Sequence, residues 1–274
     1  MTDTVAEAIR TAAERLSATS DTARLDAELL MAHALGISRS RMLITMMREA
    51  PAPAFAEFVE RRAAREPIAH ITGEQEFFGL PFRVTSDTLV PRGDSEVLVE
   101  AALELKPGAA RVLDLGTGTG ALLLAILSHT KAEGVATDRS SPALAVARDN
   151  AERMGLSART RFVERDWRKE GWTDGLGQFD LVVSNPPYVE EDAALEPDVR
   201  DYEPASALFA GPEGLDDYRV IIPQLGKLLI EGGLAILEIG ATQADSVTAI
   251  ARESGFDVAL RHDLAGRPRA LILR

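Results

Sequence analysis

The sequence predicts an α/β protein with a largely parallel sheet, preceded by a smaller helical region. From about residue 85 onward, short apolar segments alternate with segments of helical pattern. These apolar segments are continuous, without a polar residue at every second position, so both faces of each strand are expected to be buried under helices. A length of 274 residues, 46% of them hydrophobic, leaves ample material for such a core.

The chain before residue 85 has a helical pattern. Apolar residues recur at helical spacing over residues 25–34, and Gly36 is placed to end that helix. The pattern continues over residues 55–63, and residues 71–84 have the pattern of a short hairpin around Gly79 and Pro81. We therefore expect a helical domain with a hairpin over residues 1–84 and a second domain over residues 85–274.

The second domain is expected to contain seven strands with helices between them. The strands are expected at residues 112–115, 135–138, 161–163, 179–184, 234–239, 256–261 and 270–273. Helices are expected at 121–128 and 142–154, the second with Ser141 as its N-cap and Pro142 in its first turn. A parallel sheet of this kind binds ligands beyond the carboxyl ends of its strands, so motifs at those ends carry the functional prediction.

Composition excludes several classes of protein. The chain has no cysteine, which excludes a disulfide framework, a thiolate zinc site and a cysteine nucleophile. The four histidines are scattered without metal-ligand spacing, and no G-x-S-x-G motif supports a hydrolase. The first residues lack a cationic start followed by an apolar run, and the longest apolar stretch, residues 121–127, is too short to cross a bilayer. We expect a cytoplasmic protein with no bound metal and no membrane association.

The charge balance argues against nucleic acid as a partner. The formal net charge is −13, and residues 85–274 hold −11 of it. A protein that grips nucleic acid by its phosphates normally presents a basic face. The sequence therefore predicts no direct nucleic-acid binding.

A glycine-rich loop, D-L-G-T-G-T-G at residues 114–120, follows the first strand of the second domain and opens a helix. Alternate glycines let the backbone turn tightly and approach a ligand closely. Asp138 ends the next strand, where its carboxylate can accept both hydroxyls of a ribose. The dinucleotide fingerprint requires glycine at position 121, where Ala121 stands. The loop favours S-adenosylmethionine and leaves a nicotinamide cofactor open.

Two further motifs lie at strand ends. The first is Asp166-Trp167, directly after the third strand. There the carboxylate can accept a hydrogen bond from an adenine amine, and the aromatic ring can lie on the purine. The alternative is an ordinary loop aspartate beside a half-buried tryptophan. The segment S-N-P-P-Y, residues 184–188, ends the fourth strand. Its two prolines stop the strand and leave a stiff turn with an exposed carbonyl, an amide and an aromatic ring.

That turn suits a planar amide or aniline-like nitrogen. The Asn185 oxygen and the Pro186 carbonyl can each accept one N–H of such a group, and Tyr188 can stack on its plane. The nitrogen lone pair is delocalised and poorly nucleophilic. Two acceptors would favour the pyramidal geometry needed to attack a methyl sulfonium, so their stabilisation grows in the transition state. Holding the nitrogen and the methyl group in line adds an orientation effect.

Nearly the whole chain resembles the release-factor glutamine methyltransferases of HemK/PrmC type. The shared segments are R-L-D-A-E-L-L-M-A-H (24–33), E-P-I-A-H-I-T-G (66–73), L-V-P-R-G-D-S-E-V-L-V-E (89–100), D-L-G-T-G-T-G (114–120), V-S-N-P-P-Y-V (183–189), D-V-R-D-Y-E-P (198–204), L-E-I-G (237–240) and D-L-A-G-R-P-R (263–269). One departure is Gly93, where the family usually has a second proline, and it loosens the loop expected to cover the cofactor.

The resemblance implies a Rossmann-like class I methyltransferase domain behind a helical domain that receives a protein substrate. It implies methyl transfer from S-adenosylmethionine to the glutamine of the Gly-Gly-Gln loop of class I peptide chain release factors, by a protein expected to be monomeric. The implied cofactor-binding residues are Gly116, Thr117, Gly118, Thr119, Gly120, Asp138, Trp167 and Asn185, to which the motif after the third strand adds Asp166. The implied substrate-binding residues are Asn185, Pro186, Pro187 and Tyr188, of which Asn185, Pro186 and Tyr188 are expected to be catalytic.

Three alternatives remain. A glutamine methyltransferase of a ribosomal protein shares the N-P-P-Y motif and the general architecture. An adenine-amino DNA methyltransferase would need a base-flipping surface and a target-recognition region, which the acidic second domain and the lack of inserted sequence disfavour. A non-catalytic cofactor-binding adaptor would not need the acceptors of Asn185 and the ring of Tyr188.

Overall fold

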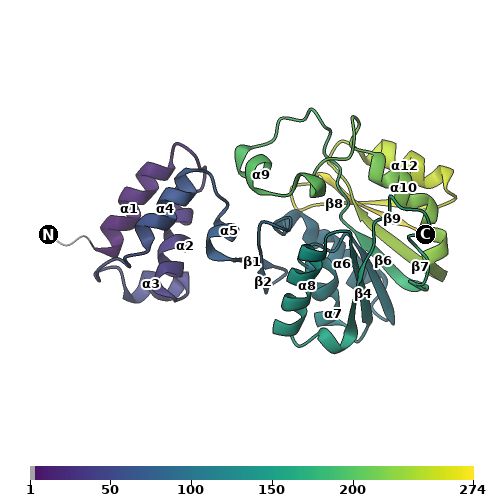
Figure 1. Ribbon diagram of the computed structural model, residues 1–274, viewed down its shortest axis with the longest axis horizontal. Coiled ribbons are helices and arrows are strands. Elements are labelled where there is room, and N and C mark those ends of the chain that lie inside the picture. The colour runs from purple at the N-terminus through teal and green to yellow at the C-terminus, as the bar shows by residue number, and fades with distance from the viewer. Residues whose placement is uncertain (1–3) are drawn as a thin grey trace. The chain divides into compact units, whose positions relative to one another are not determined.

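The computed structural model describes residues 4–274 and separates into two compact units (Figure 1). The first comprises Met1–Glu74 and Leu195–Tyr202, and the second comprises Gln75–Ala194 and Glu203–Arg274. The hairpin thus belongs to the second unit, whereas we assigned it to a first domain ending at residue 84. The domain boundary between residues 84 and 85 stays a prediction.

The first unit is helical. Its helices are α1 (Val5–Leu16), α2 (Ala23–Leu35), α3 (Arg39–Thr45), α4 (Phe55–Ala63), α5 (Ile68–Thr72) and the later α9 (Pro197–Tyr202). Helix α1 begins with a capping box between Thr4 and Glu7, and α2 ends at Gly36, whose φ of +65° gives the left-handed cap expected from the sequence. Fully buried side chains such as Ile9, Leu30 and Met42 form its core.

An ion-pair network holds α9 in the first unit. The Arg62 side chain, only 9% exposed, donates from Nε to Asp26 and from Nη1 to Asp198, each over 2.8 Å. The Tyr202 hydroxyl donates to the Ala64 carbonyl over 2.8 Å. A segment remote in sequence therefore completes this unit, which local sequence patterns did not indicate.

The second unit contains the predicted seven-stranded sheet in the order β5-β4-β3-β6-β7-β9-β8. Its strands are β3 (Arg111–Leu115), β4 (Glu133–Asp138), β5 (Thr160–Glu164), β6 (Phe179–Ser184), β7 (Leu229–Glu238), β8 (Val258–His262) and β9 (Pro268–Leu273). Pairings among the first five are parallel, and β9 runs antiparallel to both of its neighbours. The mostly parallel α/β fold is confirmed.

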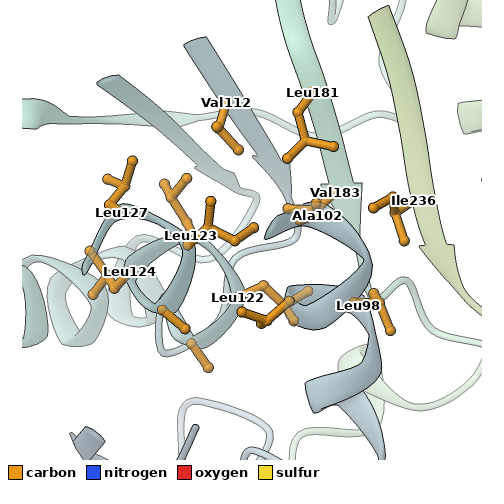
Figure 2. Packing of buried hydrophobic residues seen from close by; sticks show 14 of the residues in the cluster. Leu98, Ala102, Val112, Leu122, Leu123, Leu124, Leu127, Leu181, Val183 and Ile236 are labelled. Atoms are coloured by element: carbon orange, nitrogen blue, oxygen red, sulfur yellow. The ribbon is translucent and has the colours of Figure 1, made fainter. Parts of the chain in front are cut away.

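Helices cover both faces of this sheet. They are α6 (Glu96–Leu105), α7 (Ala121–His129), α8 (Ser141–Arg153), α10 (Asp216–Ile221), α11 (Leu225–Leu228) and α12 (Ala244–Glu253). Side chains from α6 and α7 pack against Val112, Leu181 and Ile236 on one face (Figure 2). Leu113 and Val182, the neighbours of Val112 and Leu181, belong to the core on the other face. Consecutive strand residues are thus buried on opposite faces, which explains the continuous apolar pattern.

Two local details differ from the sequence expectation. The N-cap of α8 is Ser140, whose hydroxyl accepts the Ala143 N–H over 3.2 Å, and Ser141 is the first helical residue. Ser141 cannot be the cap because it has helical geometry and its hydroxyl donates to Glu164 instead. The hairpin pairs β1 (Glu74–Phe77) with β2 (Leu80–Arg83), and residues 71 and 72 still belong to α5. None of the helices in residues 4–274 is long and apolar enough to cross a membrane.

Candidate active site

The glycine loop wraps around the end of β3 before α7 begins. Gly116, Gly118 and Gly120 all have positive φ, at +74°, +53° and +84°. The N–H groups of Gly116 and Thr117 both donate to the Thr137 carbonyl of β4, over 2.9 and 2.8 Å. The backbone therefore follows a path that L side chains rarely adopt, which is the physical reason for glycine at these alternate positions.

A buried carboxylate lies beneath this loop. Asp114 is 1% exposed, and its Oδ2 accepts from the Thr117 hydroxyl over 2.6 Å. Burial raises the pKa of Asp114 to about 7, more than the Thr117 hydrogen bond lowers it. This hydrogen bond between Thr117 and Asp114 fixes the glycine loop to the end of β3.

Asp138 ends β4 beside the glycine loop. Its Oδ2 accepts from the Gly118 N–H over 3.0 Å, and its Oδ1 accepts from the Ser140 N–H over 2.9 Å. Burial raises the pKa of Asp138, although these backbone N–H groups and Arg139 oppose the shift. Each carboxylate oxygen keeps a second lone pair, so the group can still accept two hydroxyls.

These residues face a cavity of about 260 Å³ in the second unit. The sequence-predicted residues that line it are Gly116, Thr117, Gly118, Thr119, Asp138, Trp167, Asn185 and Pro187. Gly120, Asp166, Pro186 and Tyr188 are not among its lining residues. The cavity therefore joins the ends of β3, β4, β5 and β6, as the rule for parallel sheets predicts.

Trp167 forms a wall of this cavity, and its indole ring is fixed by a hydrogen bond to a buried carboxylate. Its indole Nε1 donates to Asp217 Oδ1 over 2.7 Å, and Arg168 binds the same carboxylate over 3.1 Å. A Cβ at Gly116 would lie 3.0 Å from the ring of Trp167. Asp217 is itself a lining residue that our reading of the sequence missed, because it lies far along the chain in α10 and belongs to no recognisable motif.

Asp166 lies elsewhere. It lines a separate depression together with Glu164, Arg165 and Lys169, and its Oδ1 accepts from the Arg168 N–H over 3.0 Å. Contact between Asp166 and an adenine amine stays a prediction, and nothing in the arrangement of the main cavity favours it.

The Asn-Pro-Pro-Tyr turn begins where β6 ends. The Ser184 hydroxyl donates to the Leu115 carbonyl over 2.7 Å, which fixes this turn beside the glycine loop. Asn185 donates from Nδ2 to the Ser95 hydroxyl over 3.4 Å. The Tyr188 ring packs beside Gly240, and its hydroxyl donates to Glu238 over 3.4 Å. Stacking of Tyr188 on a substrate stays a prediction.

The segment before α6 covers part of the cavity. Leu89, Pro91, Arg92 and Ser95 line it, and Arg92 forms an ion pair with the buried Glu203. Burial raises the pKa of Glu203, although Arg92 opposes the shift. Gly93 lies in the same segment with open space around the position of a Cβ. Sequence reasoning singled out only Gly93 here; the contacts of Arg92 and Ser95 depend on residues 90 or more positions away.

The donor set fits a nucleoside-type ligand. The Asp138 carboxylate offers acceptors for ribose hydroxyls, the Trp167 ring offers a flat apolar wall, and the glycine backbone permits close approach. Within residues 4–274, no group of three His, Asp or Glu side chains is arranged to hold a metal ion.

Comparison with known proteins identifies the class of the second unit. Residues 87–200 match the family model described as methyltransferase small domain, and residues 7–73 match the PrmC N-terminal domain. The hMettl16 catalytic domain, solved in complex with the MAT2A 3'UTR hairpin 6, has a TM-score of 0.57 at 20% identity over 78% of this chain and 81% of that one. A ribosomal protein L11 methylase from Lactobacillus delbrueckii has a TM-score of 0.50 at 24% identity over 69% and 81%. These structures share the fold, and the chain is a Rossmann-like methyltransferase.

Curated relatives identify the family more narrowly. A release factor glutamine methyltransferase from Caulobacter vibrioides is 40% identical over 99% of this chain and 96% of its own length. One from Cereibacter sphaeroides is 43% identical over 98% of each chain. This protein belongs to the family of release factor glutamine methyltransferases.

Proposed function

We propose that this protein transfers a methyl group from S-adenosylmethionine to the side-chain amide nitrogen of the glutamine in the Gly-Gly-Gln motif of class I peptide chain release factors. One observation carries the proposal: Asn185, an amide acceptor at the end of β6, lines the same cavity as Asp138, a ribose acceptor at the end of β4. Membership of the family supports the choice of substrate.

The cofactor would occupy the glycine-loop side of the cavity. Asp138 would accept the ribose hydroxyls, and Trp167 would flank the adenine, with the backbone from Gly116 to Gly120 close against the ligand. When bound, S-adenosylmethionine supplies an electrophilic methyl group on a positively charged sulfur.

The Asn-Pro-Pro-Tyr turn would hold the glutamine amide. Asn185 Oδ1 and the Pro186 carbonyl would each accept one of its N–H bonds, and Pro187 would form the adjoining wall. Acceptors placed in this way favour the pyramidal nitrogen of the transition state over the planar ground state, so they lower the barrier. They also polarise the proton that must leave the nitrogen after the methyl group is transferred.

The first unit would receive the protein substrate. The release factor is the expected partner, bound as a protein to a monomeric enzyme without direct nucleic-acid contact, and the enzyme is expected to act in the cytoplasm. Since the enzyme carries a net charge of −13, basic residues of the partner would favour the encounter.

Incubation with radiolabelled S-adenosylmethionine tests the proposal. The acceptors are a class I release factor, the same factor with its motif glutamine changed to alanine, a mixture of ribosomal proteins and adenine-containing DNA. We expect label only on the intact release factor, and mass spectrometry should place it on the motif glutamine. Label on a ribosomal protein or on DNA, with the release factor unmodified, would show that the substrate is wrong.

A further inference from the structure

Trp167 lies in a segment of the chain that forms neither a helix nor a strand. The segment runs from the end of β5 at Glu164 to the start of β6 at Phe179, and the tryptophan is only partly buried in it. A ring in such a segment is not oriented by regular secondary structure, so its position depends on contacts with other parts of the chain. The role proposed for this ring, to flank an adenine, therefore needs a tertiary contact that fixes the ring.

Asp217 of α10 supplies that contact. The Trp167 Nε1 donates to Asp217 Oδ1 over 2.7 Å, at the short end of the range for N–H to oxygen bonds. Asp217 is 1% exposed and lines the cavity beside Trp167. The six-membered part of the ring lies against the glycine loop, because a Cβ at Gly116 would lie 3.0 Å from its Cη2. The ring is thus held by a hydrogen bond at one edge and by the Gly116 backbone at the other.

The Asp217 carboxylate is itself fixed from two directions. Its Oδ1 also accepts from Nε and Nη2 of Arg168, and its Oδ2 accepts from the same Nη2, each over 3.1 Å. The next residue, Tyr218, is fully buried, and its hydroxyl donates to the Glu238 backbone carbonyl over 2.7 Å. That bond joins α10 to the end of β7. The acceptor of the indole N–H therefore has a charge partner and a connection to the sheet.

We infer that Asp217 is a positioning residue for cofactor binding: it fixes the indole of Trp167 as a preformed wall for the adenine before S-adenosylmethionine binds. The inference rests on the proposed role of Trp167 beside the adenine. A ring that is already fixed loses little freedom when a ligand stacks on it, whereas a free ring must be ordered, which weakens binding. Arg168 provides the opposite charge that an ionised carboxylate needs in order to stay buried at this place.

Asp217→Leu and Asp217→Asn test the inference, because only the first removes the acceptor. Leucine is of similar size and has no acceptor, whereas asparagine can place its single carbonyl oxygen at the position of Oδ1, which accepts three of the four bonds. Asp216→Asn is the matched control, since Asp216 is the preceding residue of α10 and pairs with Arg219 on the surface. Calorimetry should measure the Kd for S-adenosylmethionine without any acceptor protein.

The expected loss follows from the ordering of one side chain. Ordering a free side chain on binding corresponds to about a 2- to 12-fold change in Kd. We expect Asp217→Leu to raise the Kd for S-adenosylmethionine by a factor in this range, and Asp217→Asn and Asp216→Asn to keep the wild-type Kd. Adenosine, which has the adenine and the ribose but no methionine, should lose affinity by the same factor, because the effect belongs to the adenine wall.

A Trp167→Phe background separates this role from a merely structural one. Phenylalanine keeps a flat ring and has no N–H to donate, so Trp167→Phe should itself weaken adenosine binding. In this background Asp217→Leu should change the Kd no further, because the bond that it breaks is already absent. A general structural role of Asp217 would weaken binding in both backgrounds.

Proton–nitrogen NMR spectra of the free protein report the ring directly, since the chain has only two indole N–H groups, those of Trp167 and Trp172. The Trp167 N–H should exchange slowly with solvent in the wild type and in Asp217→Asn, and quickly in Asp217→Leu. The N–H resonance of Trp172, which is buried in the core, should stay unchanged and so show that the second unit is folded.

Three results would overturn the inference. The first is a wild-type Kd for S-adenosylmethionine in folded Asp217→Leu, and the second is a loss for S-adenosylmethionine without a loss for adenosine. If Asp217→Leu does not fold, a wild-type adenosine Kd in Trp167→Phe would be the third. Absence of S-adenosylmethionine binding by the wild type would overturn the proposed function and the inference together. Because these measurements contain no acceptor, methylation of a ribosomal protein in place of the release factor would refute the proposed substrate alone.

Discussion

Alanine at Gly116 should destabilise the second unit more than alanine at Gly118. Both glycines have positive φ, +74° and +53°, and both lie in the loop after β3. They differ in their surroundings. A Cβ at Gly116 would lie 3.0 and 3.2 Å from two ring carbons of Trp167, whereas a Cβ at Gly118 would meet nothing within 4 Å.

Two effects can lower the stability of these variants: backbone strain at a positive φ and overpacking against a neighbouring side chain. Forcing alanine into left-handed backbone costs about 1–2 kcal/mol, and both variants incur that cost. Overpacking adds about 1–3 kcal/mol where the neighbour cannot move freely. Trp167 is such a neighbour, because its indole N–H is bound to Asp217 over 2.7 Å. We expect Gly118→Ala to lose about 1–2 kcal/mol of unfolding free energy and Gly116→Ala about 2–4 kcal/mol.

Urea denaturation followed by tryptophan fluorescence measures this difference. The two tryptophans, Trp167 and Trp172, both lie in the second unit, so the signal reports that unit alone. Midpoints should be compared at constant m-value. In a Trp167→Leu background, followed by circular dichroism, the gap between the two variants should close, since the obstructing ring is gone. Equal losses for the two variants in the wild-type background would refute the argument.

Three further predictions concern the turn, the covering segment and the buried carboxylate. Asn185→Ala should lower kcat about 10²–10³-fold, as expected for loss of one group that acts in the transition state, with little change in the Kd for S-adenosylmethionine by calorimetry; near-normal turnover would contradict the mechanism. Gly93→Pro should raise the unfolding free energy by about 0.4–1 kcal/mol, because proline restricts the unfolded chain. The site accepts proline, since Gly93 begins a 3₁₀ turn and Arg92 before it has φ −104° and ψ 139°, the extended conformation that a following proline requires. A lower urea midpoint would contradict this. Because burial raises the pKa of Glu238 from its ordinary 4.5 to about 7, the folded state keeps that proton longer than the unfolded state. The stability that comes from this bound proton is fully present below about pH 4.5 and is lost as pH rises through about 7. Across that window the unfolding free energy of the wild type, measured by urea denaturation, should fall by about 3 kcal/mol relative to that of Glu238→Gln. Parallel pH dependence of the two proteins would contradict this prediction.

The strands and the loops at their carboxyl ends were predictable because the signal for each lies in neighbouring residues of the sequence. Continuous apolar runs identified the buried strands, and the alternate glycines marked a backbone that must turn left-handed after β3. The rule that ligands bind beyond the carboxyl ends of parallel strands predicted that Asp138, Trp167 and Asn185 lie near one another, and in the structure they line one cavity.

It was harder to predict which segments of the chain make up each of the two units, because this depends on contacts between distant parts of the sequence. Residues 195–202 join the first unit through the ion pair of Arg62 with Asp198. No sequence pattern near either residue predicts that these two side chains are in contact. The same holds for the hairpin, whose apolar residues Phe77 and Phe82 are buried in the core under α6 and α7. A break in composition near residue 85 could not reveal which neighbours bury those rings.

The residues that sequence reasoning missed at the site have a common physical role. Asp217 accepts from the Trp167 indole, and Ser95 accepts from the Asn185 amide; both act on a residue of a recognised motif from a remote part of the chain. Each supplies a fixed hydrogen-bond partner, and neither needs a particular neighbour in sequence to do so. Motifs therefore identify the groups that face a ligand, whereas the orientation of those groups is decided by buried partners. For an amide such as Asn185, whose two ends differ only in whether they donate or accept, that orientation decides whether the group can hold a substrate N–H.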